Sequence, residues 1–227
     1  MLHAVIPAAG TGKRFGGATP KQYLMIGGMT VMQWTINRIT AFPQIGNVIV
    51  AVHPDDRLAD TLPFDHPFKL RFVIGGDERS DSVLAGLRAL DCPDDDWVLV
   101  HDVARPCITA ADLERLIHMA GADPVGGLLA LPVRDTLKKS GDNGLQVAHT
   151  LPRDHVWQAQ TPQMFRYGLL RRALETACRD GQPVTDESSA VEYLGLHPLL
   201  VPGNPRNLKI TYPEDLELAS FFLSHSS

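Results

Sequence analysis

The 227-residue sequence lacks the features of several protein classes. It has only three cysteines, at positions 92, 107 and 178, and no CxxC pair, which excludes a disulfide framework and a zinc ribbon. It has no run of about 18 apolar residues and no basic leader with a cleavage site, so we expect neither a membrane span nor a signal peptide and expect a cytoplasmic protein. No basic run with interleaved aromatic residues occurs, and the formal net charge of −5 gives no electrostatic footprint for nucleic acid polymers.

What remains is an ordinary globular composition. Hydrophobic residues make up 44% of the chain, and acidic residues outnumber basic ones by 26 to 21. Because one domain typically has about 150 residues, the length predicts a single domain over residues 1–227 with a sizeable core. Because the overall charge is negative, any anionic ligand must meet a local basic site.

Strand-like and helix-like segments alternate along the chain. Apolar runs of strand length occur at residues 2–6, 47–52, 70–74, 97–100, 127–133 and 199–201. Helical spacing of apolar residues occurs at 31–42, 82–90, 113–120, 169–178 and 188–194. Thr109 with Asp112 predicts one capping box, and Thr211 with Glu214 predicts another before a last helix. This alternation predicts an α/β fold with a mostly parallel sheet flanked by helices on both faces.

Residues 136–160 break this pattern. Two short segments of alternating polarity, 136–139 and 145–150, flank the turn-forming sequence SGDNG and predict a hairpin. A hairpin that projects from an α/β body has few core contacts of its own. We therefore expect an arm that packs against a second copy in a homodimer. The alternative is a hairpin folded back on its own body.

The loops that follow the predicted strands hold the candidate ligand-binding residues, because open parallel sheets bind ligands beyond the carboxyl ends of their strands. The first loop, PAAGTGKRFGG at 7–17, continues to Lys21 and resembles a phosphate cradle of glycines and cations. Arg14 follows Gly-Lys where a Walker A loop has Ser or Thr, and Phe15 takes the third glycine position of the dinucleotide fingerprint. A flexible glycine loop with solvated cations is the simpler alternative.

Two further loops carry glycines and carboxylates. The sequence GGDERSDS at 75–82 suits recognition of a base or ribose, or is a glycine turn followed by a helix cap. In HDVARP at 101–106, Asp102 is a candidate Mg²⁺ ligand, since Mg²⁺ prefers one or two carboxylates with phosphate oxygens. The alternative is a salt bridge between Asp102 and Arg105. We expect His101 to be a packed residue, because no nearby His or Cys completes a zinc site.

The sequence shows no nucleophilic Ser or Cys with a His partner and no GxSxG. The candidate residues instead provide positioning and charge neutralisation, as phosphoryl or nucleotidyl transfer requires. An NAD-dependent oxidoreductase is disfavoured by the failed fingerprint.

An ordered set of motifs resembles one family, the 2-C-methyl-D-erythritol 4-phosphate cytidylyltransferases of the non-mevalonate isoprenoid pathway. The motifs are PAAGTGKR at 7–14, PKQY at 20–23, GGDER at 75–79, DSV at 81–83, HD at 101–102, ARP at 104–106, PVRDT at 132–136 and TPQ at 161–163. The resemblance implies a Rossmann-like nucleotidyltransferase fold and a homodimer that exchanges hairpin arms. It also implies the reaction of CTP and methylerythritol phosphate, with Mg²⁺, to CDP-methylerythritol and pyrophosphate.

The resemblance also implies roles for individual residues. Arg14 and Lys21 would stabilise the transition state at the α-phosphate. Residues that would hold CTP are Ala8, Ala9, Gly10, Gly76, Asp77 and Ser82. Residues that would orient methylerythritol phosphate are Asp102, Thr136, Arg153, Thr161, Thr185 and Lys209, with Arg153 and Thr161 coming from the partner's arm. Two alternatives stay open: a cytidylyltransferase for ribitol 5-phosphate, and a non-catalytic nucleotide-binding protein.

Overall fold

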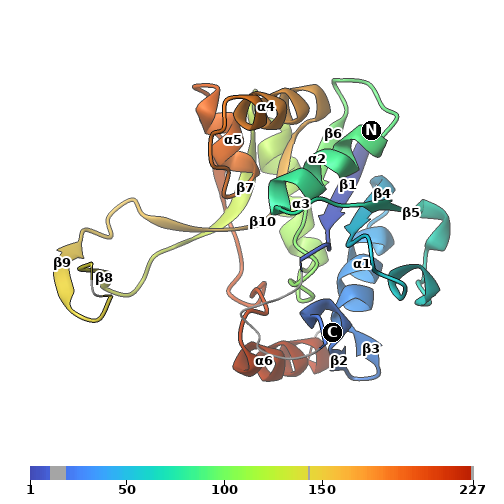
Figure 1. Ribbon diagram of the computed structural model, residues 1–227, viewed down its shortest axis with the longest axis horizontal. Helices are drawn as coiled ribbons and strands as arrows, with labels where there is room; N and C mark the ends of the chain where they lie inside the picture. Colours follow the sequence, from blue (N-terminus) through green and yellow to red (C-terminus); the bar gives the residue numbers. More distant parts are fainter. Residues whose placement is uncertain (11–18, 143, 226–227) are drawn as a thin grey trace.

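The computed structural model describes residues 1–10, 19–142 and 144–225, and its centre is a seven-stranded sheet between helices (Figure 1). The strands follow the order β11-β7-β10-β6-β1-β4-β5. Their bounds are β1 Leu2–Pro7, β4 Ile45–Val52, β5 Leu70–Ile74, β6 Trp97–Val100, β7 Gly126–Pro132, β10 Trp157–Arg166 and β11 Leu199–Pro202. All pairings in this sheet are parallel except the two made by β10, which confirms the predicted α/β class.

Helices cover both faces of the sheet. One face carries α1 (Val31–Ala41) and α3 (Ala110–Gly121), and the other carries α2 (Arg79–Ala89), α4 (Tyr167–Arg179) and α5 (Glu187–Tyr193). Side chains alternate between the faces along β1, so that Ala4 and Ile6 join the first core and Val5 joins the second. The last helix, α6 (Pro213–Ser224), packs beside the small β2–β3 sheet (Met25–Ile26 and Met29–Thr30).

The helix starts follow local capping chemistry. Thr109 caps α3 together with Asp112, as predicted. The predicted cap of α6 is wrong by one residue: the N-cap is Tyr212, because the Asp215 carboxylate accepts the N–H groups of both Thr211 and Tyr212. Helix α2 begins at Arg79, three residues before the start that its apolar spacing predicts.

Strand β10 was not predicted, although it lies in the middle of the sheet between β6 and β7. Its sequence WQAQTPQMFR places Gln160, Pro162 and Gln163 in a buried strand, where a proline normally argues against strand structure. The register against β7 shifts between Ala159 and Gln163, so the proline falls at an irregularity of the ladder.

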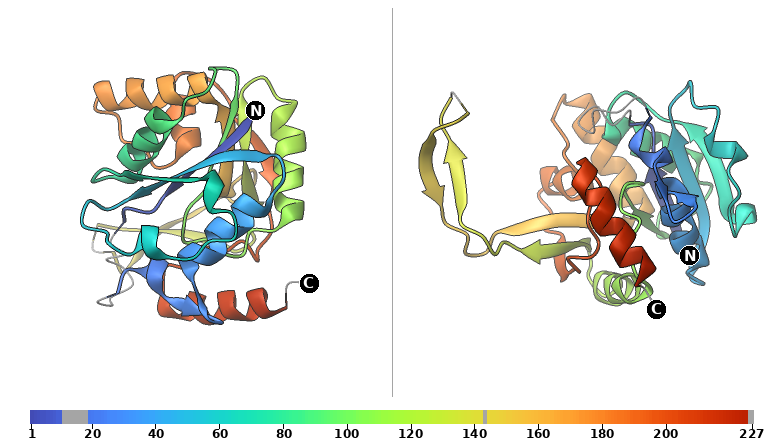
Figure 2. Two further views of the ribbon diagram at one scale, coloured as in Figure 1. Left: turned by 90° about the vertical axis from the view of Figure 1, so that its right-hand side faces the viewer. Right: turned by 90° about the horizontal axis from the view of Figure 1, so that it is seen from below.

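The predicted hairpin consists of β8 (Leu137–Ser140) and β9 (Val147–Leu151), which project far from the body of the protein (Figures 1 and 2). Every residue of β9 is exposed. The hairpin leaves the body from β7 and returns to it through β10, so both of its ends are held by the central sheet. Within the described ranges, no helix has the length and apolar character needed to cross a membrane.

Candidate active site

A pocket with several charged side chains lies at the carboxyl ends of β1 and β6, where the sheet topology predicts a ligand site. A second pocket adjoins it on the side of β10 and α5, and Arg79, Asp102 and Lys209 line both. The first pocket is lined by Pro7, Ala8, Ala9, Gly10, Lys21, Gln22, Gly76, Asp77, Glu78, Arg79, Ser82, Asp102, Val103, Ala104 and Lys209. All six residues predicted to hold CTP therefore lie around one pocket.

The glycine loop after β5 is shaped by close packing. A Cβ on Gly75 would lie 2.7 Å from the Ser82 hydroxyl oxygen and 2.8 Å from the Ala9 Cβ, and one on Gly76 would lie 2.3 Å from the Asp81 Cβ. The Ser82 hydroxyl accepts the Gly76 N–H at 3.2 Å, which ties the loop to the first turns of α2. The absence of a Cβ at 75 and 76 thus lets this loop pack against Ala9 and the first turns of α2, with Gly76 lining the pocket.

Lys21 begins a short 3-10 helix (Lys21–Tyr23) whose neighbours fix its place. Its ammonium group donates to the Ile210 carbonyl oxygen at 3.0 Å. The Gln22 amide donates to the Ala8 carbonyl oxygen at 3.2 Å, and the Tyr23 hydroxyl donates to Asp56 at 2.5 Å. Lys21 is therefore held at the pocket edge. The other predicted transition-state residue, Arg14, lies outside the described residues.

The floor shared by the two pockets is a buried cluster of charges. The Asp102 carboxylate accepts Arg79 Nε at 2.8 Å and Lys209 Nζ at 2.7 Å, and Arg105 Nε lies 3.8 Å away. The Arg79 terminal nitrogens donate to both Glu187 oxygens at 2.7 and 3.0 Å. The expected alternative of a salt bridge to Arg105 is thus the longest of three cationic contacts.

The pKa values follow from this arrangement. Burial alone would raise the pKa of Asp102, but the charges of Arg79, Lys209 and Arg105 outweigh it and hold that pKa far below its usual range. Burial raises the pKa of Glu187, and Arg79 only partly offsets this. Three cations face the two carboxylates of this cluster, and Asp186 lines the second pocket beside them. Lys209, with 34% of its side chain exposed, is the most accessible of the three cations to an anionic substrate.

The surroundings of Asp102 decide whether it can bind Mg²⁺. Both of its oxygens are already engaged by cations, and its side chain is only 8% exposed. A divalent cation on Asp102 would have to displace Lys209 or Arg79 and would face the remaining cations at close range. The residues present therefore do not fit a magnesium ion held by Asp102.

A chain of hydrogen bonds holds the backbone beside Asp102. The Asp102 N–H donates to the Thr161 hydroxyl at 3.0 Å, and that hydroxyl lies 3.0 Å from His101 Nδ1. His101 Nε2 lies 3.1 Å from the Arg105 carbonyl oxygen, which can only accept, so Nε2 carries the proton and Nδ1 accepts from Thr161. Burial lowers the pKa of His101 to about 4 and keeps it neutral, as expected of a packed residue.

Thr161 consequently belongs to the floor of its own protomer, and the expectation that it comes from a partner's arm is wrong. It sits in β10, with 4% of its surface exposed, and lines the second pocket. Thr185 lines that pocket as well, and its hydroxyl donates to Ser189 at the start of α5. Four of the six predicted acceptor-side residues are thereby brought together: Asp102, Thr161, Thr185 and Lys209.

Thr136 and Arg153 lie elsewhere. Both are exposed residues at the base of the arm, and neither lines the two pockets. The Arg153 guanidinium donates to the Arg134 carbonyl oxygen across the arm base. Within one protomer, these two residues are not part of the site.

The sequence prediction missed Glu187 and gave no role to Arg79. Arg79 belongs to the GGDER motif, so its charge and its position after a predicted strand could have marked it as a site residue. Glu187 follows Thr185 and Asp186 in the chain, but no spacing relates it to Arg79, which lies 108 residues away.

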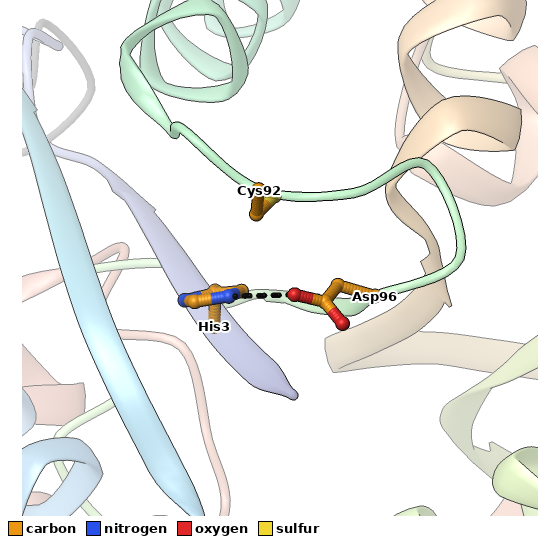
Figure 3. A group of neighbouring side chains, drawn as sticks. All are labelled: His3, Cys92 and Asp96. Atoms are coloured by element: carbon orange, nitrogen blue, oxygen red, sulfur yellow. Dashed lines mark hydrogen bonds and ion pairs between the residues drawn. The ribbon is translucent and has the colours of Figure 1, made fainter.

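Among the described residues, one group of metal-ligating side chains comes together away from the pockets: His3, Cys92 and Asp96 (Figure 3). It lies at the amino ends of β1 and β6, opposite the candidate site. His3 Nδ1 accepts the Asn47 N–H at 3.4 Å, so the neutral ring carries its proton on Nε2, which faces Asp96 at 3.3 Å. Because that proton occupies the nitrogen a metal would need, we interpret the group as a hydrogen-bonded pair beside a thiol.

Comparisons with known proteins agree over nearly the whole chain. Residues 2–225 match the family described as 2-C-methyl-D-erythritol 4-phosphate cytidylyltransferase. A protein of that name from Chromobacterium violaceum is 51% identical over 97% of each chain, and one from Serratia proteamaculans is 48% identical over 97% of this chain and 93% of its own. A crystal structure described as 4-diphosphocytidyl-2C-methyl-D-erythritol synthase has a TM-score of 0.85 and 39% identity, covering 98% of both chains.

Proposed function

The chain belongs to the 2-C-methyl-D-erythritol 4-phosphate cytidylyltransferase family, and from this premise we propose that it transfers the cytidylyl group of CTP to 2-C-methyl-D-erythritol 4-phosphate. The products are CDP-methylerythritol and pyrophosphate. The observation that carries the proposal is the pair of adjoining pockets, one edged by the glycine loop and the other by β10 and α5, with the Arg79–Asp102–Lys209 cluster between them. A nucleotide and a phosphate monoester would meet at that cluster.

CTP would occupy the first pocket. Gly76, Asp77 and Ser82 would face the cytosine and ribose, as would the backbone of Ala8 to Gly10. The close packing of Gly75 and Gly76 supports this assignment through size alone, because the two N–H groups already donate to the Val52 carbonyl oxygen and the Ser82 hydroxyl.

The acceptor would occupy the second pocket. Lys209 supplies a cation there, and Asp102 orients that cation and offers an acceptor for substrate hydroxyl groups. Thr161 donates its own proton to His101, so toward the substrate its hydroxyl would act only as an acceptor. Thr185 is the exposed hydroxyl at the rim.

The reaction would be an in-line displacement at the α-phosphorus. An oxygen of the acceptor phosphate forms the new P–O bond, and the bond to the β-phosphate breaks, releasing pyrophosphate. A phosphate monoester has a second pKa of about 6 and is largely dianionic near neutral pH, so no general base is required. The barrier is the repulsion between the dianion and the triphosphate, which Lys21, Arg14 and Lys209 would offset.

We propose Mg²⁺ as the cofactor on the grounds that nucleotidyltransferases generally use a divalent cation. Since Asp102 does not fit as its ligand, the ion would enter on the phosphate oxygens of CTP, which Mg²⁺ binds readily. It would supply neutralisation of the triphosphate charge.

We further propose a homodimer in the cytoplasm, where CTP is available. Leu145 is 94% exposed and Val147 62% exposed on the projecting hairpin, and Thr136 and Arg153 stand exposed at its base. Insertion of the arm beside a second copy would cover these apolar side chains and bring Thr136 and Arg153 to the partner's acceptor pocket.

The direct test is release of pyrophosphate from CTP and Mg²⁺ with methylerythritol 4-phosphate, with ribitol 5-phosphate, or with no acceptor. We expect release only with methylerythritol 4-phosphate. Release only with ribitol 5-phosphate would keep the mechanism and change the acceptor. No release of pyrophosphate with either acceptor, from protein that still binds CTP, would favour the non-catalytic alternative.

A further inference from the structure

Glu187 is a buried carboxylate that faces the back of the site without touching either pocket. It is the first residue of α5 and only 1% exposed. Both of its oxygens accept hydrogen bonds from the terminal nitrogens of Arg79, at 2.7 and 3.0 Å. This bidentate pair joins the first residue of α2 to the first residue of α5.

Arg79 also binds Asp102, so the position of its guanidinium group affects both carboxylates. Its third donor, Nε, reaches Asp102 Oδ1 at 2.8 Å. With two terminal nitrogens fixed on Glu187, the planar guanidinium cannot turn to offer a second donor to Asp102. Asp102 Oδ2 is thereby available to Lys209, whose ammonium lies 2.7 Å away, with Arg105 Nε farther off at 3.8 Å.

We propose that Glu187 is a positioning residue for the acceptor-phosphate subsite, acting through Arg79 to hold Asp102 and Lys209 in their places. The inference rests on the proposed function. Without the Glu187 charge, Arg79 is free to pair with both oxygens of Asp102, which is its preferred geometry with a carboxylate. Lys209 then loses its partner at the acceptor pocket, while the glycine loop and Lys21 on the nucleotide side stay as they are.

The test is the Glu187→Gln variant, whose amide keeps the shape of the side chain but offers one acceptor in place of two. We expect the KM for methylerythritol 4-phosphate to rise about 10-fold or more, while the KM for CTP changes less than about 2-fold. The matched control is Glu175→Gln, which removes the same charge from a surface pair with Arg88 (3.5 Å) and should leave both constants unchanged.

A purely electrostatic effect of Glu187 predicts the opposite change in the acceptor KM. Removing a negative charge near an anion site strengthens anion binding by simple electrostatics. An acceptor KM that falls or stays unchanged in Glu187→Gln would therefore overturn the positioning role. If the wild-type enzyme itself does not use the acceptor, the proposed function fails instead.

A double variant tests whether the effect runs through Arg79. In an Arg79→Gln background, adding Glu187→Gln should change the acceptor KM less than about 2-fold, because the Arg79 guanidinium that links Glu187 to Asp102 is already missing. A full additional loss in that background would contradict the inference. Glu187→Asp keeps the charge in case the glutamine variant unfolds, but its side chain is one methylene shorter and cannot hold both terminal nitrogens of Arg79 in the same place. We expect the acceptor KM of this variant to rise above the wild-type value while the CTP constants stay unchanged, and an unchanged acceptor KM in a folded Glu187→Asp protein would contradict the positioning role.

Discussion

The floor of the candidate site and the β8–β9 arm are built in opposite ways. On the floor, Asp102 is a buried carboxylate with three cationic neighbours, and Glu187 is a buried carboxylate held by both terminal nitrogens of Arg79. These residues come from parts of the chain that are far apart in the sequence. In the arm, every residue of β9 is exposed, and a Lys138–Thr150 side-chain bond links the two strands. One region is held together by contacts within its own chain, and the other is a projecting hairpin with few such contacts, which in the proposed homodimer would pack against a second copy.

This difference separates the acceptor-side residues into two groups. Asp102, Thr161 and Lys209 are in place within a single protomer, whereas Thr136 and Arg153 lie outside the pockets. Changes on the floor should therefore act on the fold and the chemistry together, and changes in the arm should act on activity through the partner.

The largest effect is expected for Asp102→Asn. The neutral amide leaves Arg79, Arg105 and Lys209 with one buried carboxylate among them, and breaking such a buried pair costs about 3–5 kcal/mol. Turnover with the acceptor should be lost as well. Denaturant unfolding at pH 7 measures the first effect, with the exposed Asp180→Asn as a control that should leave the unfolding midpoint in place. Wild-type stability in Asp102→Asn would mean that the floor is not held by charge.

Lys21→Ala should separate chemistry from folding. Loss of one cation at the transition state lowers kcat by about 10²-fold or more, whereas Lys21 lies at the pocket edge and its loss should cost less than about 1 kcal/mol of stability. Arg14→Ala should behave in the same way. Steady-state kinetics with thermal unfolding of the same samples checks both variants, and near-normal turnover in either would remove its assigned role.

The pH dependence of stability tests the buried chain from Asp102 through Thr161 to His101. The unfolded His101 takes up a proton near pH 6.5, while the folded one stays neutral down to about pH 4. Protonation therefore favours the unfolded state, and the free energy of unfolding should fall as the pH drops through this window, by about 3 kcal/mol. In His101→Gln this part of the slope should be missing. Parallel slopes in the two proteins would show that His101 titrates normally.

Sequence patterns predicted most of this architecture because the relevant signals are local. The six apolar runs became strands, and the spacing before Leu113 gave the correct cap at Thr109. The motif set gave the family, which the comparisons confirm. It also brought residues from the loops after β1, β5 and β6 to one pocket, since the strand ends of a parallel sheet meet at one edge, whereas the PVRDT motif at 132–136 lies outside that pocket.

The failures have tertiary causes. Strand β10 carries Gln160, Pro162 and Gln163, which read as a loop, yet Gln163 is satisfied by Asp186 and the Ser188 N–H once α5 packs beside it. Glu187 was missed because its partner Arg79 is remote in sequence. Thr161 was placed in the arm because the return of the chain to the sheet, at Trp157, has no local marker.

The smallest effect, and the sharpest test of the arm, is complementation between two inactive variants. Lys21→Ala disables the body of the site, and Arg153→Ala disables the arm. If each arm serves its partner, a mixed dimer has one site built from an intact body and an intact arm. Random exchange of equal amounts should then restore about a quarter of wild-type activity, since half of the dimers are mixed and each has one working site of two.

The same mixture decides between the two placements of the hairpin. An arm folded back on its own body would leave every site with one defect, so mixed dimers would stay inactive even where exchange is demonstrated by differently tagged subunits. Recovery, in contrast, requires Arg153 to act across the interface, because no protomer in the mixture carries both an intact Lys21 and an intact Arg153. That outcome would explain why Arg153 and Thr136 stand exposed at the arm base while the rest of the acceptor site is already assembled.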